Sequence, residues 1–476
     1  MKSKTLMISI LTALFSILLL NQANAESVTS GDYQYKVDSG KATLLRYLGP
    51  ETGTLILPEQ LDGHSVTAIG ESVFLSNMFT SVVIPAGVVS ITPGAFSSCV
   101  DLASIQVAAG NTVYEQVDGV LFDKTKKTLH TYPAARAQAA YQVPEGTTGI
   151  QTSAFYMAAQ LTSLALPNSI TEIGETAFYG CSGLLTVSIP QGVTAIGSRA
   201  FSLCSSMQAV SFPASITSIG VSLFEYCTSL IEVHVDAANP VYEVLDGVLF
   251  DKTQRLLHTY PPALPNTSYQ VPDGTQTIGN LAFANSQNLE FLQIPDSVTT
   301  IQDGAFSGSM KLKDVVLPNG LTRIEANLFA ACKDLAKIQI PASVQTIGPQ
   351  SFYNCEDLNQ VSIPFGVTAI EAYAFAYCNY INTITIPGSV VTIGEGAFMA
   401  ADWISSIQLP SSVQSIGPYA FSECSNMTSI SIPASVTSIG DSAFYSSGRL
   451  TAIVEKDSYA HTYFSENKLS FTIGNP

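Results

Sequence analysis

Eight cysteines offer the most versatile chemistry in this sequence, because thiols can form disulfides, bind metals or act as nucleophiles. Each lies fourteen residues after one of the prolines that mark a 23-residue repeat in this sequence, and other copies of the repeat hold alanine or serine at that position. A position that accepts Cys, Ala or Ser predicts a small buried side chain, so we expect free, buried thiols. Side chains on neighbouring coils would also point in parallel, which disfavours disulfides. The cysteines are Cys99, Cys181, Cys204, Cys227, Cys332, Cys355, Cys378 and Cys424.

Histidine, carboxylate and hydroxyl residues do not have the spacing of a catalytic motif. The sequence lacks His-Glu-x-x-His, Gly-x-Ser-x-Gly and a glycine-rich phosphate loop after a strand. His130 and His258 are equivalent positions of a duplicated segment, which favours a structural role. Asp118 with Asp123, and their counterparts in the second copy, could hold a cation or serve turns. We therefore expect no catalysis, no cofactor and no metal site.

Two aromatic residues break the repeat at a position that is otherwise small or polar. The sixteenth residue after the proline is Tyr380 in one repeat and Trp403, the only tryptophan, in the next. Tyr377 lies about one turn from Tyr380. Exposed Tyr and Trp are enriched at binding hot spots and offer flat apolar surfaces to sugars. Tyr377, Tyr380 and Trp403 are therefore candidate ligand-binding residues, and packing against a neighbouring loop is the alternative interpretation.

Uncharged polar residues at the outward strand positions form a second candidate surface. Their side chains should repeat along one face of the predicted sheet. Rows of uncharged donors and acceptors suit glycans or protein backbone, although a plain solvated face would look the same. The row includes Ser188, Ser211, Gln293, Gln339, Ser362, Thr385, Gln408 and Ser431.

The elements that must position these residues come from a 23-residue repeat, marked by prolines between residues 167 and 213 and between 295 and 433. Apolar and polar residues alternate before each proline, which predicts a short strand with one buried face. A phenylalanine follows thirteen of the prolines by eleven residues, from Phe96 to Phe444, and predicts a ladder of buried rings. Because no unit can bury these residues alone, we expect a β-rich solenoid in which stacked units form a parallel sheet.

The prolines of this set number fourteen, from Pro58 to Pro433, and predict about fourteen stacked coils over residues 58–454. Two 59-residue gaps contain insertions of 36 residues, at about 107–143 and 235–271. Both insertions contain Asp-Gly-Val-Leu-Phe-Asp-Lys-Thr and Leu-His-Thr-Tyr-Pro, at an offset of 128 residues. This match indicates a duplicated block, and each copy is predicted to form a hairpin.

Both ends depart from the repeat, as solenoid ends must. Residues 1–25 have a basic start, a 15-residue apolar run and a small-x-small end, which is typical of a secretory signal peptide. Residues 26–57 predict an N-terminal β cap, and residues 455–476 predict a capping helix that begins at Asp457 or Ser458. No second apolar run is long enough to span a bilayer, so we expect no transmembrane span in the mature chain.

The composition narrows the classes of partner. Only 12% of the 476 residues are charged, and 20 basic against 37 acidic residues give a formal charge of −17. Loss of Lys2 and Lys4 with the signal would bring the charge to −19. Nucleic-acid binding needs clustered Lys and Arg, so this balance argues against it.

The unit Ile-Pro-x-x-Val-Thr-x-Ile-Gly-x-x-Ala-Phe, as at residues 432–444, resembles the BspA-like class of leucine-rich repeats. The Asp-Gly-Val-Leu-Phe-Asp insertion and the Ser-Tyr-Ala-x-x-Tyr end are similar to the same family. The resemblance implies an exported, cell-surface or periplasmic solenoid that binds a protein or glycan, such as an extracellular-matrix or cell-surface protein. A structural scaffold of the cell envelope is the alternative.

Overall fold

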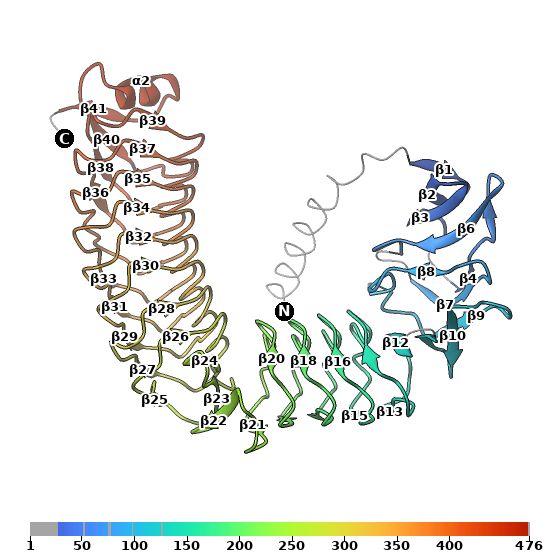
Figure 1. The fold of residues 1–476 in the computed structure, drawn as a ribbon. Helices are drawn as coiled ribbons and strands as arrows, with labels where there is room; N and C mark the ends of the chain where they lie inside the picture. Colours follow the sequence, from blue (N-terminus) through green and yellow to red (C-terminus); the bar gives the residue numbers. More distant parts are fainter. Residues whose placement is uncertain (1–26, 51–52, 75–77, 98, 125–126, 475–476) are drawn as a thin grey trace. The chain divides into compact units, whose positions relative to one another are not determined.

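The computed structural model describes residues 27–50, 53–74, 78–97, 99–124 and 127–474 (Figure 1). The predicted export signal, residues 1–25, lies outside the described residues. The chain divides into two compact units, the first made of residues up to 184 with 192–201 and the second of residues 185–191 with 202–476. Each unit is a stack of short-stranded coils, which confirms the predicted β-rich, parallel solenoid.

The first unit begins with an antiparallel meander that covers the end of its core. Tyr35, Ala42 and Leu44 point inward from this meander and are almost fully buried. The meander and its partners are β1 (Val28–Ser30), β2 (Tyr33–Asp38), β3 (Lys41–Tyr47), β5 (Gln60–Leu61), β6 (His64–Ile69) and β8 (Ser90–Ile91). A separate parallel sheet holds β4 (Gly53–Ile56), β7 (Phe79–Ile84) and β9 (Ser104–Val107).

The remaining coils of the first unit continue this stack in parallel. The register shifts by one repeat at each step, so that Glu172 of one strand lies opposite Ala195 of the next. These strands are β13 (Ala140–Gln142), β14 (Gly149–Ile150), β15 (Ser163–Ala165), β16 (Glu172–Ile173) and β18 (Ala195–Ile196). Because equivalent residues face each other along the ladder, each row of the repeat becomes a row in space.

Each insertion forms three antiparallel strands, so the predicted hairpin is confirmed and a second one precedes it. In the first copy Asn111 is 4% exposed, donates to the carbonyls of Pro85 and Val88, and accepts from the amides of Val113 and Tyr114. Asn239 makes the same four contacts in the second copy. The strands are β10 (Tyr114–Val117), β11 (Val120–Asp123) and β12 (Thr128–Thr131), and then β22 (Tyr242–Leu245), β23 (Val248–Asp251) and β24 (Leu256–Thr259).

Most coils of the second unit contribute a first strand before a proline and a two-residue second strand after it. The first strands are β17 (Thr186–Ser188), β19 (Ala209–Phe212), β21 (Glu232–Val235), β25 (Ser268–Gln270), β27 (Phe291–Gln293), β29 (Asp314–Val316), β31 (Lys337–Gln339), β33 (Gln360–Ser362), β36 (Ser406–Gln408), β38 (Ser429–Ile432) and β40 (Thr451–Val454). The second strands are β20 (Ser218–Ile219), β26 (Thr277–Ile278), β28 (Thr300–Ile301), β30 (Arg323–Ile324), β32 (Thr346–Ile347), β34 (Ala369–Ile370), β35 (Thr392–Ile393), β37 (Ser415–Ile416) and β39 (Ser438–Ile439).

Where a glycine follows the second strand, neighbouring coils approach each other too closely for a side chain at that position. A Cβ atom on Gly417 would lie 2.5 Å from the amide nitrogen of Glu395, and one on Gly197 would lie 2.3 Å from that of Glu175. Real Cβ atoms do not approach backbone this closely. The glycine therefore lets the turns of successive coils stack without a side chain between them.

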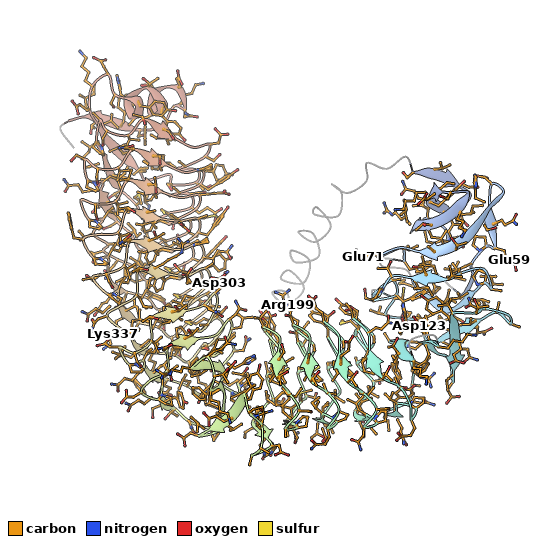
Figure 2. The ribbon with its side chains drawn as sticks, in the orientation of Figure 1. Glu59, Glu71, Asp123, Arg199, Asp303 and Lys337 are labelled. Atoms are coloured by element: carbon orange, nitrogen blue, oxygen red, sulfur yellow. The ribbon has the colours of Figure 1, made fainter. Side chains whose placement is uncertain are left out.

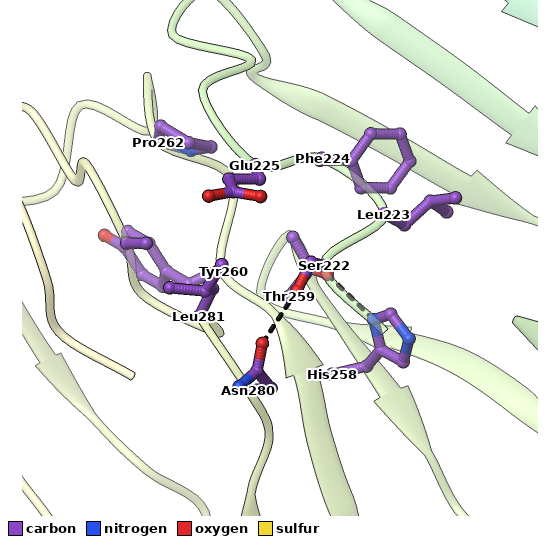
Figure 3. A pocket seen from close by; sticks show the side chains of 11 residues that line it. Ser222, Leu223, Phe224, Glu225, His258, Thr259, Tyr260, Pro262, Asn280 and Leu281 are labelled. Carbon is purple, nitrogen blue, oxygen red and sulfur yellow. Dashed lines mark hydrogen bonds between the residues drawn. The ribbon is translucent and has the colours of Figure 1, made fainter. Parts of the chain in front are cut away.

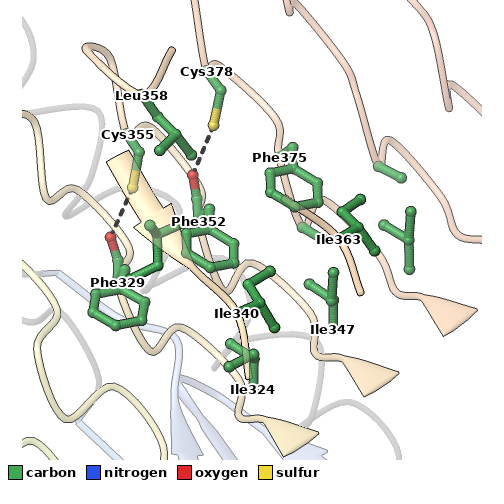
Figure 4. Packing of buried hydrophobic residues seen from close by; sticks show 14 of the residues in the cluster. Ile324, Phe329, Ile340, Ile347, Phe352, Cys355, Leu358, Ile363, Phe375 and Cys378 are labelled. Atoms are coloured by element: carbon green, nitrogen blue, oxygen red, sulfur yellow. Dashed lines mark hydrogen bonds between the residues drawn. The ribbon is translucent and has the colours of Figure 1, made fainter. Parts of the chain in front are cut away.

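The predicted phenylalanine ladder forms the centre of the core (Figure 4). Phe329, Phe352 and Phe375 stack face to face on successive coils, with ring centroids 5.4 and 5.1 Å apart. All three are fully buried, and each such side chain stabilises the fold by about 1.5–3 kcal/mol through the hydrophobic effect. The repeat thus places a buried aromatic ring at the same position of successive coils.

The structure has about 18 coils, so the prediction of about fourteen is wrong. The two insertions account for two of the additional coils, and in each of them a tyrosine replaces the ladder phenylalanine. Tyr132 stacks on Phe155 at 4.8 Å, and Tyr260 stacks on Phe283 at 5.0 Å. These tyrosines do not follow a proline of the regular set, and a count based on proline spacing therefore misses their coils.

The C-terminal end is closed by helix α2 (Tyr459–Glu466) and strand β41 (Phe471–Ile473). The Ser458 hydroxyl accepts a hydrogen bond from the amide of His461, so Ser458 is the N-cap, one of the two predicted residues. Phe464 points from the helix onto Phe444, with ring centroids 5.0 Å apart. The helix thereby covers the last ring of the ladder.

Candidate functional site

All eight cysteines are buried and reduced, as their positions predict. The thiols of Cys355 and Cys378 donate to the carbonyls of Phe329 and Phe352, 26 residues earlier, at 3.1 and 3.0 Å (Figure 4). Burial raises the pKa of Cys99 and of Cys424 to about 12. These thiols are therefore protonated at neutral pH, and their role is to fill and link neighbouring coils.

The duplicated carboxylates serve turns. Asp251 is 4% exposed, and its Oδ1 atom accepts hydrogen bonds from the amide and hydroxyl of Thr253 and from the amide of Gln254. In the part of the chain that the structure describes, no three His, Cys, Asp or Glu side chains come together as metal ligands. The contacts of Asp251 favour the turn interpretation over the cation interpretation.

A small cavity brings Ser222, His258 and Asn280 together near the second insertion (Figure 3). The Ser222 hydroxyl donates to the Asn280 side-chain oxygen at 2.7 Å, and His258 contacts the Thr259 hydroxyl at 2.8 Å. Burial lowers the pKa of His258 to about 4, so its ring is neutral at pH 7. The cavity measures about 20 Å³, which is room for a water molecule and not for a substrate.

Tyr380 and Trp403 lie side by side at the surface of the second unit. Tyr380 is 46% exposed and Trp403 is 53% exposed, and their ring centroids are 5.3 Å apart with the planes tilted by 41°. Each residue sits in a short turn whose following isoleucine, Ile381 or Ile404, is fully buried. The buried isoleucines anchor the turns, so the two rings form a fixed apolar surface in contact with solvent.

Tyr377 does not join this pair. Its backbone is left-handed, with φ of 59°, and its ring packs edge-on against Tyr353 with centroids 5.3 Å apart. Over the described residues, no ring contact connects Tyr377 with Tyr380 or Trp403. The structure therefore brings two of the three candidate residues together and places the third elsewhere. We name the exposed pair Tyr380 and Trp403 the aromatic pair.

The first-strand ladder is interrupted beside the aromatic pair. Residues 381–387 form no strand, although they hold the strand register between β33 and β36. Within this described segment, the amides of residues 382–386 make no backbone hydrogen bond to either neighbour. The second-strand ladder continues past the same coils through β34, β35 and β37. The coils therefore stay stacked, although their first-strand segments are not joined by backbone hydrogen bonds here.

The predicted polar row does face solvent. Six of its eight residues, including Gln293, Gln339 and Gln408, are exposed, and Ser211 and Ser431 are partly exposed. Sequence reasoning missed two exposed aromatic residues on this unit, Phe365 at 78% exposure and Phe291 at 48%. Both stand at positions where other repeats hold polar or small residues, so comparing every row of the repeat would have found them.

Comparisons with known proteins agree with this fold. The family model for the BspA type leucine-rich repeat region matches residues 60–131, 139–254, 263–379 and 345–469. A leucine-rich cell surface protein from Faecalibacterium prausnitzii is 24% identical over 88% of this chain and 95% of its own, with a TM-score of 0.45.

Two further solved structures are similar to this chain. A leucine-rich repeat protein from Bacteroides ovatus is 24% identical over 94% of this chain and 100% of its own, with a TM-score of 0.45. One from Eubacterium ventriosum is 19% identical over 79% of this chain and 95% of its own, with a TM-score of 0.47. No curated protein matches the chain.

Proposed function

Because the chain belongs to the BspA-type leucine-rich repeat family, we propose that it is an exported binding protein that recognises a protein or glycan at a cell surface. Export rests on residues 1–25, whose basic, apolar and small-residue segments are typical of a signal peptide. In the described part of the chain, no helix has the length and hydrophobicity that crossing a membrane requires. Secreted, cell-surface and periplasmic locations all fit this proposal.

The observation that carries the proposal is the exposed aromatic pair. Tyr and Trp give large contact areas while losing little side-chain entropy on binding, which is why they dominate binding hot spots. Tyr380 and Trp403 are held by buried neighbours, so binding would not have to order them first. Their position beside an interrupted ladder, where backbone amides lack partners, adds hydrogen-bond donors next to an apolar surface.

The charge and surface chemistry indicate the kind of partner. The chain carries a formal charge of −17, and its outward strand row is mainly Ser, Thr and Gln. Such a surface suits uncharged hydroxyl, amide and backbone groups better than phosphates. Extracellular-matrix proteins, other cell-surface proteins and glycans are therefore the partners to screen, and we expect binding without catalysis.

A binding screen with a double variant tests the proposal. The mature chain, from residue 26, is assayed on matrix proteins, mucins and a glycan array, together with Tyr380→Ser/Trp403→Ser. We expect the wild type to bind at least one ligand and the variant to bind it at least about tenfold more weakly, as for hot-spot residues. The matched control is Tyr445→Ser/Tyr459→Ser, which removes two aromatic residues with 61% and 46% exposure elsewhere on the same unit.

Two outcomes would contradict the proposal. Equal binding by the wild type and Tyr380→Ser/Trp403→Ser would show that the aromatic pair is not the contact surface. If none of the added ligands binds and the protein associates tightly with the cell envelope, the structural scaffold is supported instead.

A further inference from the structure

A groove runs along the first-strand face of four consecutive coils in the second unit. Its volume is about 270 Å³, close to the lower end of the usual range for small-ligand sites. Residues of β27, β29, β31 and β33 line it, together with the residues just before these strands. They include Phe291, Lys313, Asp314, Lys337, Asn359 and Gln360. Lys337 is seen on the outer side of the coils, beside the β31 strand (Figure 2).

The floor of the groove coincides with a second interruption of the first-strand ladder. Elsewhere along this face, the amides of Lys313 and Asp314 donate to the Glu290 carbonyl, and those of Asn359 and Gln360 donate to the Ala336 carbonyl. Between these two steps, β29 and β31 are not paired, and within the described coils no backbone hydrogen bond connects residues 336–337 to residue 313. Lys313, Ala336 and Lys337 all line the groove, so the Lys313 carbonyl and the amides of Ala336 and Lys337, which are not bonded to one another, lie beside it.

The charged side chains of the groove are already matched with one another. Lys313 pairs with Glu290 at 2.8 Å and Lys337 pairs with Asp314 at 3.0 Å, in each case between neighbouring coils. With Glu290, which pairs with Lys313 but does not itself line the groove, the charges at the groove balance, although the chain as a whole is strongly acidic. The lining offers the ammonium donors of two lysines, the Asp314 carboxylate and the side-chain amides of Asn359 and Gln360.

One wall of the groove is apolar. The Phe291 ring is 48% exposed. It stands at the start of the strand, at a solvent-facing position that is polar or small in the neighbouring coils. Across the β27–β29 ladder, Phe291 lies opposite Asp314. A half-exposed ring that borders hydrogen-bonding groups suits a ligand with one apolar face and many hydroxyls.

We propose that this groove binds a neutral oligosaccharide, with one sugar ring stacked on Phe291 and its hydroxyl groups bonded to the Lys337–Asp314 pair, Asn359 and Gln360. Hydroxyl groups both donate and accept, so they match a mixed set of donors and acceptors whose charges are paired. A polyanion would have to displace the acidic partners of both lysines and approach an acidic protein. The coils repeat at about 4.8 Å, a spacing similar to the length of one sugar ring, so an extended glycan can follow them.

The inference does not depend on the aromatic pair. Tyr380 and Trp403 do not line the groove, and the variants that test the two sites are different. If the groove variants bind as well as the wild type and Tyr380→Ser/Trp403→Ser loses binding, this inference alone is overturned. If the groove variants lose binding and Tyr380→Ser/Trp403→Ser binds like the wild type, the role of the aromatic pair alone is overturned.

The test uses the purified chain from residue 26 and four hexasaccharides: β-1,4-linked glucose, β-1,3-linked glucose, β-1,4-linked N-acetylglucosamine and α-1,4-linked galacturonic acid. Isothermal titration calorimetry should show binding of at least one neutral hexamer, with affinity that changes less than about twofold between low and high salt. Phe291→Ala and Asn359→Ala/Gln360→Ala should each weaken that binding at least about tenfold. All three side chains are exposed or partly exposed, so these variants should fold.

The control variant is Phe365→Ala, which removes an equally large aromatic residue that is 78% exposed and does not line the groove. It should bind within about twofold of the wild type. The proposal is overturned if no neutral hexamer binds at millimolar concentration, if the groove variants bind like the control, or if the galacturonic acid hexamer binds more tightly than every neutral one.

Discussion

Two neighbouring regions of the second unit share one core and differ on their outer face. We call residues 313–403 the interrupted region and residues 406–454 the regular region. The ring centroids of Phe352 and Phe375 in the interrupted region are 5.1 Å apart, and those of Phe421 and Phe444 in the regular region are 5.8 Å apart. The ring planes differ by only 1° and 4°. Cysteine thiols donate to phenylalanine carbonyls in both regions, at 3.0 to 3.1 Å.

The outer faces of the same two regions are unlike. In the regular region β36, β38 and β40 form an unbroken parallel ladder, and the sixteenth-position residues are Asn426 and Arg449. In the interrupted region the ladder opens at residues 336–339 and 381–387, beside the groove and beside the aromatic pair. The buried positions and the second-strand ladder therefore hold the coils together, and the outer positions are free to acquire binding residues.

The largest expected effect tests whether the core is packed equally well in the two regions. Phe375→Ala in the interrupted region and Phe421→Ala in the regular region should each destabilise the protein by about 3–5 kcal/mol, because each leaves a cavity in the ring ladder. Urea denaturation followed by circular dichroism measures both. A much smaller loss for Phe375→Ala would show that the core of the interrupted region is loosely packed and would break the comparison.

The next effect concerns the open ladder itself. The amides of residues 382–386 have no backbone partners in their described coil, whereas residues 429–432 pair with strands on both sides. We expect hydrogen–deuterium exchange to be at least about tenfold faster in the first segment, as for unprotected amides. Mass spectrometry of peptides that cover each segment measures the rates. Equal protection would mean that the ladder is closed in solution.

A smaller effect is expected from the surface charges of the groove. Lys337→Met removes an ion pair with Asp314 whose side chains are 59% and 38% exposed. Exposed pairs contribute about 0.2–1 kcal/mol, and less in high salt, so the unfolding free energy should change by no more than that. A loss above about 2 kcal/mol would show that the pair supports the interrupted region structurally, against its proposed role in binding.

The smallest expected difference lies in thiol reactivity. Cys378 in the interrupted region and Cys424 in the regular region are both fully buried, and burial raises the pKa of both thiols. Neither should react with a thiol reagent at pH 8 in the native protein, and all eight thiols should react after denaturation. Mass mapping of the labelled cysteines checks this. Selective native labelling of Cys378 would show that the open ladder exposes the core.

The sequence predicts the inside of this molecule better than its outside. Periodicity alone locates the strands, the phenylalanine ladder and the buried cysteines, because each depends on one residue type at a fixed position. Coil number is underestimated, since Tyr132 and Tyr260 occupy ladder positions without a proline in phase. Spacing also groups Tyr377 with Tyr380, whereas the left-handed backbone at Tyr377 directs its ring to Tyr353.

The interrupted ladder has no signal in residue types. Residues 383–385 are Thr-Ile-Thr, an alternation that predicts a strand as well as that of any regular coil. Whether backbone groups reach their partners depends on how neighbouring coils are spaced, which is set by packing around the whole coil. The exposed rings of Phe291 and Phe365 were predictable in principle, because they break polar rows of the repeat.

The central claim is that ligands bind the interrupted outer face and not the regular one. Hydrogen–deuterium exchange of the mature chain, with and without the ligand found in the binding screen, tests this most directly. We expect slower exchange on binding at residues 380–386 and 403–405, and no change at residues 426–432. Protection of residues 426–432 without protection of residues 380–386 would contradict it.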